Sequence, residues 1–136
     1  NVAEPVCHEG AGERILYVDD EMPLALLGEK ILGRLGYVVE RFTKPLDALA
    51  AVKAAPEAYD LVITDQMMPK LMGTDLAAEI HALRPDLPIV LMTGHTSTLT
   101  PERLRPLGIG ELVLKPLSID GLGEVVHRML APGRKG

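Results

Sequence analysis

Four short apolar segments, each followed by a polar residue, constrain the fold of this chain most strongly. The clearest, residues 61–63, is continuously apolar rather than alternating, and the strand it predicts leads to Asp65. A continuous apolar run is typical of a strand that helices cover on both faces, as in a parallel sheet. The sequence therefore predicts a buried strand that carries a carboxylate at its end.

Three other apolar segments repeat this plan. They are residues 15–18 before Asp19 and Asp20, residues 89–92 before Thr93, and residues 112–114 before Lys115. In an open α/β sheet, ligands bind beyond the carboxyl ends of the strands, so we expect these polar residues to converge at one edge. Three carboxylates, a hydroxyl and an ammonium in one crevice indicate divalent-metal and phosphoryl chemistry.

Between the strands, apolar residues recur at spacings of three and four, which is typical of amphipathic helices. The side chains that we expect to face the core are Leu24, Leu27, Ile31 and Leu35; Leu46, Leu49 and Val52; Leu76, Ile80 and Leu83; and Leu122, Val125, Val126 and Met129. A further short helix begins at Pro101 and is expected to end early at Pro106. With one more strand at residues 37–42, strand and helix alternate five times, which predicts an α/β fold.

For three residues in the loop after Asp65 and in the helix that follows it, the sequence predicts a specific structural role. Gly73 is expected to supply a positive φ in the loop, and Thr74 to act as the N-cap of the helix. His81 lies off the apolar stripe of that helix and is expected to be exposed to solvent.

Length and composition narrow the class of protein. The 136 residues suit one domain with one core. The net charge of −5 argues against a nucleic-acid surface, because domains that bind nucleic acid usually carry a basic face. No apolar run approaches the roughly 20 residues that cross a bilayer, and the N-terminus lacks the apolar region of a signal peptide. We therefore expect a cytoplasmic domain without membrane contact, although its parent protein could be membrane-anchored.

Cys7 is the single cysteine, which excludes an intrachain disulfide or a thiolate metal cluster.

The expected domain occupies residues 13–131. Residues 1–12 have no hydrophobic period and are interpreted as a linker or tail, and residues 132–136 as a C-terminal tail. Because the first residue is Asn1 rather than Met, we expect the chain to be cut from a longer protein.

The carboxylates at the strand ends are significant as a group. An aspartate directly after a strand is often only a turn residue or a helix cap. Asp19 and Asp20 facing Asp65, however, would repel one another, and without a cation one of them would tend to protonate. A bound Mg²⁺, which prefers oxygen ligands, removes this cost. Lys115 either pairs with Asp65 or a phosphoryl oxygen, or is simply a solvated surface lysine.

These motifs together resemble the receiver domain of two-component signalling proteins, over roughly residues 13–130. The resemblance rests on the five-fold strand–helix rhythm and on residues 17–21 with their acidic pair, residues 65–69 with Gly73, Thr93 with Gly94, and Lys115 with Pro116. It implies a flavodoxin-like, doubly wound sheet of five parallel strands in the order 2-1-3-4-5, with five helices. It also implies a self-phosphorylating switch domain that is not an enzyme by itself.

The resemblance implies a role for each acidic residue of the site. Asp65 would be the phosphoacceptor, a carboxylate nucleophile that becomes an aspartyl phosphate. Asp20 and Asp65 would bind Mg²⁺ directly and Asp19 would bind it through water. The backbone carbonyl of Met67 would complete the protein's ligands to the metal.

The remaining site residues would stabilise the phosphoryl group and transmit the signal. Lys115 and the metal would neutralise its charge, and Thr93 would donate its hydroxyl to a phosphoryl oxygen and draw the following loop inward. Many receivers carry a switching aromatic residue three places before the lysine. Leu112 stands there instead, so the coupling to the rest of the domain is expected to differ.

The expected partner is a histidine kinase or a histidine phosphotransfer domain. The parent would be a hybrid sensor histidine kinase, which the terminal segments favour, or a response regulator that stands alone or has lost its DNA-binding part. Two other functions are alternatives. A magnesium-dependent phosphohydrolase also uses an aspartate nucleophile, but usually has a second acid where Met67 stands here. A receiver that only binds proteins would not need the clustered charge.

Overall fold

The structure, a computed structural model, describes residues 12–68, 70–94, 100–115 and 119–130. The expected tail at 132–136 and, apart from Gly12, the expected linker at 1–12 lie outside these ranges. Pro69 and Pro116 of the sequence motifs also lie outside them. The domain boundaries therefore stay predictions.

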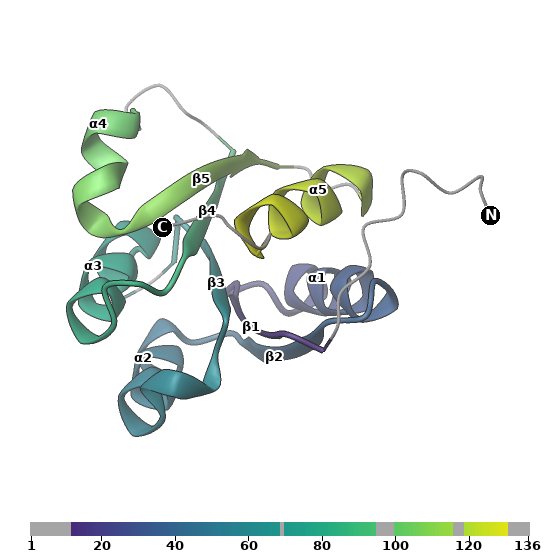
Figure 1. Cartoon of the computed structure of the whole chain (residues 1–136), viewed down its shortest axis with the longest axis horizontal. Helices are drawn as coiled ribbons and strands as arrows, with labels where there is room; N and C mark the ends of the chain where they lie inside the picture. Colours follow the sequence, from purple (N-terminus) through teal and green to yellow (C-terminus); the bar gives the residue numbers. More distant parts are fainter. Residues whose placement is uncertain (1–11, 69, 95–99, 116–118, 131–136) are drawn as a thin grey trace.

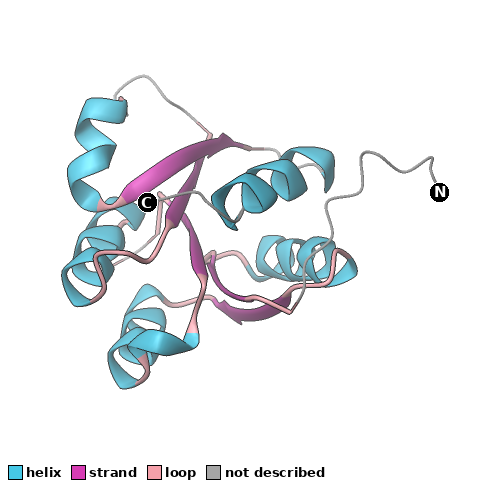
Figure 2. Cartoon of the chain, in the orientation of Figure 1, coloured by secondary structure: helices cyan, strands magenta, loops and turns pink. Residues whose placement is uncertain are grey.

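Five parallel strands form one sheet in the order β2-β1-β3-β4-β5. The strands are β1 (Arg14–Val18), β2 (Val38–Phe42), β3 (Leu61–Asp65), β4 (Ile89–Thr93) and β5 (Ile109–Leu114). The helices are α1 (Met22–Arg34), α2 (Pro45–Ala54), α3 (Gly73–Leu83), α4 (Pro101–Leu104) and α5 (Ile119–Leu130), with short 3-10 helices η1 (Pro56–Ala58) and η2 (Arg105–Leu107). Strands and helices alternate along the chain (Figures 1 and 2). The predicted fold class, strand order and short fourth helix are confirmed.

Helices cover both faces of the sheet (Figure 1). On one face, α1 and α5 pack over a core that includes Ile15 and Ile63, and on the other α2 and α3 pack over Leu16 and Val62. Neighbouring residues of one strand therefore enter different cores, and every residue of β3 and β4 is buried. This two-sided burial explains the continuous apolar runs in the sequence. Among the described residues, no helix combines the length and the apolar character needed to cross a membrane.

Three leucines that were expected in the core are exposed instead. Leu27 of α1 is 42% exposed, Leu46 of α2 51% and Leu83 of α3 40%. Small residues contribute much of the buried helix faces, namely Ala25 and Gly28 in α1, Ala48 in α2, and Gly73 and Ala77 in α3. At Gly28, an added Cβ would lie only 2.2 Å from Cζ of the Tyr17 ring. The spacing-based prediction was wrong for Leu27 because the buried face of α1 runs through Gly28 and Leu32 instead. At Gly28 the Tyr17 ring leaves no room for a larger side chain.

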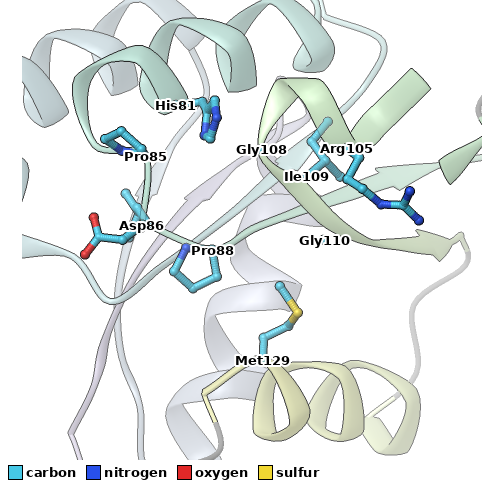
Figure 3. A pocket seen from close by; sticks show the side chains of 10 residues that line it. His81, Pro85, Asp86, Pro88, Arg105, Gly108, Ile109, Gly110 and Met129 are labelled. Atoms are coloured by element: carbon cyan, nitrogen blue, oxygen red, sulfur yellow. The ribbon is translucent and has the colours of Figure 1, made fainter. Parts of the chain in front are cut away.

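The prediction that His81 is simply exposed was also wrong. Its ring is partly buried against Gly108, and its buried Nδ1 atom has no hydrogen-bond partner in the described part of the chain. Beside it, a cavity of about 290 Å³ opens between the end of α3, the turn into β5, and Met129 of α5 (Figure 3). This cavity lies at the amino ends of β4 and β5, so it belongs to the opposite edge of the sheet from the strand-end polar residues.

Candidate functional site at the carboxyl edge of the sheet

The strand order brings the strand-end carboxylates together. Asp19 and Asp20 follow β1, and Asp65 ends β3, the strand that pairs with β1. One ligand oxygen from each of these three residues lies within 4.8 Å of the others. Thr93 is the last residue of β4, which pairs with β3, so it also lies at the carboxyl ends of the strands.

Two of the three carboxylates are withdrawn from solvent. Asp19 is fully buried and Asp65 is 6% exposed, whereas Asp20 is partly exposed. The Asp19 Oδ1 atom accepts the backbone N–H of Glu21 at 3.0 Å, which holds this carboxylate at the start of the β1–α1 connection. Asp19 and Asp65 therefore form the buried part of the cluster, and Asp20 is its part that solvent can reach.

Lys115 lies between the two buried carboxylates. Its Nζ atom is 3.3 Å from Asp19 Oδ2 and 3.1 Å from Asp65 Oδ1, and its side chain is 22% exposed. The backbone N–H of Lys115 donates to the carbonyl of Thr93 at 2.9 Å, which extends the pairing of β5 with β4 beyond the strand ends. The surface-lysine alternative is therefore wrong, because the ammonium group is held inside the acidic cluster.

The charges of the cluster do not balance. Burial raises the pKa of Asp65, and the hydrogen bond from Lys115 lowers it. The charge of Asp19 raises it further, so the pKa of Asp65 is raised overall. Burial lowers the pKa of Lys115, but its hydrogen bond to Asp65 and the charges of Asp19 and Asp65 outweigh burial and leave the pKa raised. One ammonium group faces three carboxylates, so the donor set consists of oxygens with excess negative charge. That is the chemistry that Mg²⁺ prefers.

Without divalent metal, replacing Asp65 with asparagine is expected to stabilise the domain at neutral pH. Because the folded-state pKa of Asp65 is raised, its protonated form favours the fold. This stabilisation is complete below the unfolded-state pKa and is lost as the pH rises through the folded-state pKa. Asparagine stays neutral at every pH, and Lys115 keeps its contact with Asp19. A gain of about 1 kcal/mol would raise the melting temperature by roughly 3–6 °C.

Circular dichroism melting curves with EDTA, recorded between acidic and neutral pH, measure this difference. The two proteins should converge in stability at acidic pH, where Asp65 is protonated. An Asp65→Asn variant that melts below the wild type at neutral pH would contradict the expected strain of the ionised carboxylate.

Sequence reasoning missed Gln66. The Gln66 backbone N–H donates both to the carbonyl of Met92 at 2.9 Å and to Asp65 Oδ1 at 3.0 Å. Its side-chain Oε1 accepts the backbone N–H of Thr74 at 2.9 Å. The prediction of Thr74 as N-cap was wrong, because α3 begins at Gly73 and Gln66 supplies the acceptor from outside the helix. A buried glutamine beside an aspartate gives no local sequence signal for this contact.

Gly73 is needed for space rather than for its backbone angles. An added Cβ would lie 2.3 Å from the carbonyl oxygen of Asp65 and 2.9 Å from Cα of Gln66. The positive φ that was predicted for Gly73 occurs instead at Lys70, where φ is 72°. The start of α3 therefore presses against the strand end that carries Asp65.

A family model described as the response regulator receiver domain matches residues 15–127. The chain belongs to this family. Receiver domains are the phosphoacceptor parts of two-component signalling systems. The acidic cluster of this receiver domain consists of Asp19, Asp20 and Asp65.

Curated relatives are longer proteins. The receiver domain is 34% identical to the transcriptional regulatory protein ZraR of Salmonella typhimurium over 121 residues, 89% of this chain and 27% of the relative. It is 30% identical to the C4-dicarboxylate transport transcriptional regulatory protein DctD of Rhizobium meliloti over 118 residues, 87% of this chain and 25% of the relative. The receiver domain thus spans about a quarter of these relatives.

Solved structures share the fold over nearly the whole domain. A receiver domain protein from Clostridium thermocellum matches with a TM-score of 0.81 and 26% identity, covering 87% of this chain and 94% of that one. The Vibrio cholerae chemotaxis protein CheY4 matches with a TM-score of 0.81 and 25% identity, covering 88% and 100%.

Leu112 occupies the position where many receivers carry an aromatic residue. It lies in β5, three residues before Lys115, and is partly buried against the core cluster beneath α2 and α3. A branched aliphatic side chain in this place has no polar group or ring to exchange between a buried and an exposed position.

Proposed function

We propose that this receiver domain takes a phosphoryl group from a phosphohistidine onto Asp65. The observation that carries the proposal is the position of Lys115 Nζ, 3.1 Å from Asp65 Oδ1 and 3.3 Å from Asp19 Oδ2. In the transfer, a carboxylate oxygen of Asp65 forms a bond to phosphorus while the bond from phosphorus to the imidazole nitrogen breaks. The imidazole leaves with the bonding electron pair, and Asp65 becomes an acyl phosphate.

The metal ligands in this proposal are Asp19, Asp20, Asp65 and the backbone carbonyl of Met67. Asp20 and Asp65 would bind Mg²⁺ directly, and Asp19 would bind it through a water molecule. The clustered carboxylate oxygens support this assignment, and the partly exposed Asp20 provides access to the cluster. When bound, Mg²⁺ supplies positive charge to the phosphoryl oxygens.

The charged and polar side chains each have a separate task. Lys115, held by buried Asp19, is placed to neutralise the charge that develops on the phosphoryl group next to Asp65. Thr93 stands at the end of β4 and would donate its hydroxyl to a phosphoryl oxygen of the product. That bond would draw in the segment after β4 and change the surface formed by α4, β5 and α5.

The proposed partner is a histidine kinase or a histidine phosphotransfer domain, and the domain itself contacts neither nucleic acid nor membrane. Two parents are proposed. Similarity to the transcriptional regulatory proteins ZraR and DctD supports a transcriptional response regulator. A hybrid sensor histidine kinase is the other parent proposed. The full-length gene distinguishes the two.

Intact-mass spectrometry after incubation with acetyl phosphate and Mg²⁺ tests the proposal. We expect the wild type to gain the mass of one phosphoryl group, and Asp65→Asn to gain none. EDTA should prevent the gain in the wild type, because the carboxylates alone repel the anionic donor.

The same experiment separates the alternative functions. Steady release of phosphate with many turnovers per protein would indicate a phosphohydrolase and contradict the proposed receiver chemistry. A domain that neither gains phosphate nor consumes the donor would be a module that only binds proteins.

A further inference from the structure

Gln66 joins the strand end that carries Asp65 to the first turn of α3. Gln66 is 9% exposed, and both its backbone and its side chain form hydrogen bonds to α3. Its carbonyl accepts the backbone N–H of Gly73 at 2.9 Å, and its Oε1 accepts the backbone N–H of Thr74 at 2.9 Å. The side-chain amide also faces the Thr74 hydroxyl at 3.4 Å. One residue therefore makes contacts on both sides of the loop 67–72.

The side-chain contact replaces a helix cap that α3 lacks. The N-cap residue, Met72, makes no side-chain hydrogen bond, so the first N–H groups of the helix need other acceptors. The carboxamide oxygen of Gln66 meets this need from the preceding strand. Its orientation is in turn fixed, because the Gln66 backbone N–H is shared between Met92 and Asp65.

Within the segment that these contacts close, Lys70 is held in a conformation that it would not prefer alone. Lys70 has a φ of 72°, a left-handed value that costs a residue with a side chain roughly 1 kcal/mol or more. Such a conformation persists only where the surroundings determine it. Met67, the first residue of the loop, follows Gln66 directly, so the clamp at the base of the loop restrains the peptide that carries the Met67 carbonyl.

We propose that Gln66 is a positioning residue for the divalent metal: its carboxamide clamps the loop so that the Met67 carbonyl is held toward the cluster of Asp19, Asp20 and Asp65. This inference rests on the proposed function, in which that carbonyl is a metal ligand. Gln66 itself does not touch the metal. Its side chain acts through the loop closure, as outer partners of metal ligands do in other sites.

Magnesium titrations of the whole chain, followed by ¹H–¹⁵N NMR without any phosphodonor, test the role. Gln66→Met keeps the length of the side chain but removes the acceptor for Thr74, and we expect about tenfold weaker Mg²⁺ binding. Gln66→Asn, which stays polar but is one methylene too short, should weaken binding similarly. Gln66→Glu keeps the acceptor and should bind Mg²⁺ at least as tightly as the wild type, because its added negative charge, which salt screens little at a buried position, attracts the cation.

A stability control separates positioning from general loosening. Tyr59→Phe removes the hydrogen bond from the buried Tyr59 to Glu40, 2.7 Å long and far from the loop in sequence. It is expected to destabilise the fold by about 1 kcal/mol without changing Mg²⁺ affinity. With acetyl phosphate, Gln66→Met should need about tenfold more Mg²⁺ for half-maximal phosphorylation but reach the wild-type rate at saturation.

The outcomes separate a failure of the Gln66 clamp from a failure of the proposed receiver function. Wild-type affinity in both Gln66→Met and Gln66→Asn would overturn the clamp and leave the receiver function standing. Equal weakening in Gln66→Glu would also overturn it, because the acceptor would then not matter. A wild-type domain that shows no Mg²⁺ binding would overturn both the clamp and the metal site.

Discussion

Replacing Lys115 with methionine is expected to slow the phosphorylation of Asp65 by acetyl phosphate by roughly 10²–10³-fold, the usual effect of losing one charge-stabilising donor. In the structure the ammonium lies 3.1 Å from Asp65 Oδ1, close to the atoms where phosphoryl charge would develop. Methionine has a similar length but no charge. The rate, measured by intact mass under saturating Mg²⁺, should fall while a stable acyl phosphate is still formed slowly.

Metal binding provides the second readout for this variant. Lys115 neutralises Asp19 and Asp65 in the metal-free protein, so its removal should leave Mg²⁺ affinity unchanged or higher. Lys53→Met, an exposed position in α2, serves as the matched control and should change neither quantity. A Lys115→Met variant that is phosphorylated at the wild-type rate would show that the ammonium only balances the resting charge of the carboxylates.

Gly73→Ala is expected to destabilise the domain by about 3 kcal/mol, at the upper end for overpacking. The new Cβ would lie 2.3 Å from the carbonyl oxygen of Asp65 and 2.7 Å from Cδ1 of Leu91, and the strand backbone cannot move aside cheaply. Either α3 or the end of β3 must shift. The melting temperature should fall on the order of 10 °C, and phosphorylation should slow because Asp65 moves with its backbone.

Gly33→Ala is the matched control for this substitution. Gly33 lies in α1, and beyond its chain neighbours and the local helix backbone no described atom lies within 4 Å of an added Cβ. An alanine there should raise stability by up to about 1 kcal/mol, because alanine favours the helix more than glycine does. Chemical denaturation of both variants gives the comparison. Equal stability of Gly73→Ala and the wild type would mean that the contact between α3 and β3 is looser than the structure shows.

The fold could be predicted because its signals are local. Residues 61–63 and 89–92 are apolar without alternation, and a strand buried on both faces requires this pattern. Pro23 and Pro45 lie in the first turns of α1 and α2, where the missing N–H costs nothing. Gly36 has a φ of 97°, as expected for the residue that follows a helix.

Predictions failed where a distant residue decided the local outcome. Leu27 was placed in the core by its spacing, but the buried face of α1 contains Gly28 instead, where the Tyr17 ring leaves no room for a side chain. Thr74 has a good side chain for an N-cap, yet the helix begins before it and its N–H bonds to Gln66. Spacing along one helix carries no information about the side chains on the sheet that it covers.

The sequence by itself determined the alternation of strands and helices, and with it the polar residues at the strand ends, because hydrophobic period and proline position act over a few residues. Only the tertiary structure decided the distances on which the chemistry depends. Because of the strand order, Lys115 lies between Asp19 and Asp65. The packing of α3 on the sheet brings the Thr74 N–H within hydrogen-bonding distance of Gln66. These contacts join residues from different elements, so they arise from packing in three dimensions and have no local pattern to reveal them.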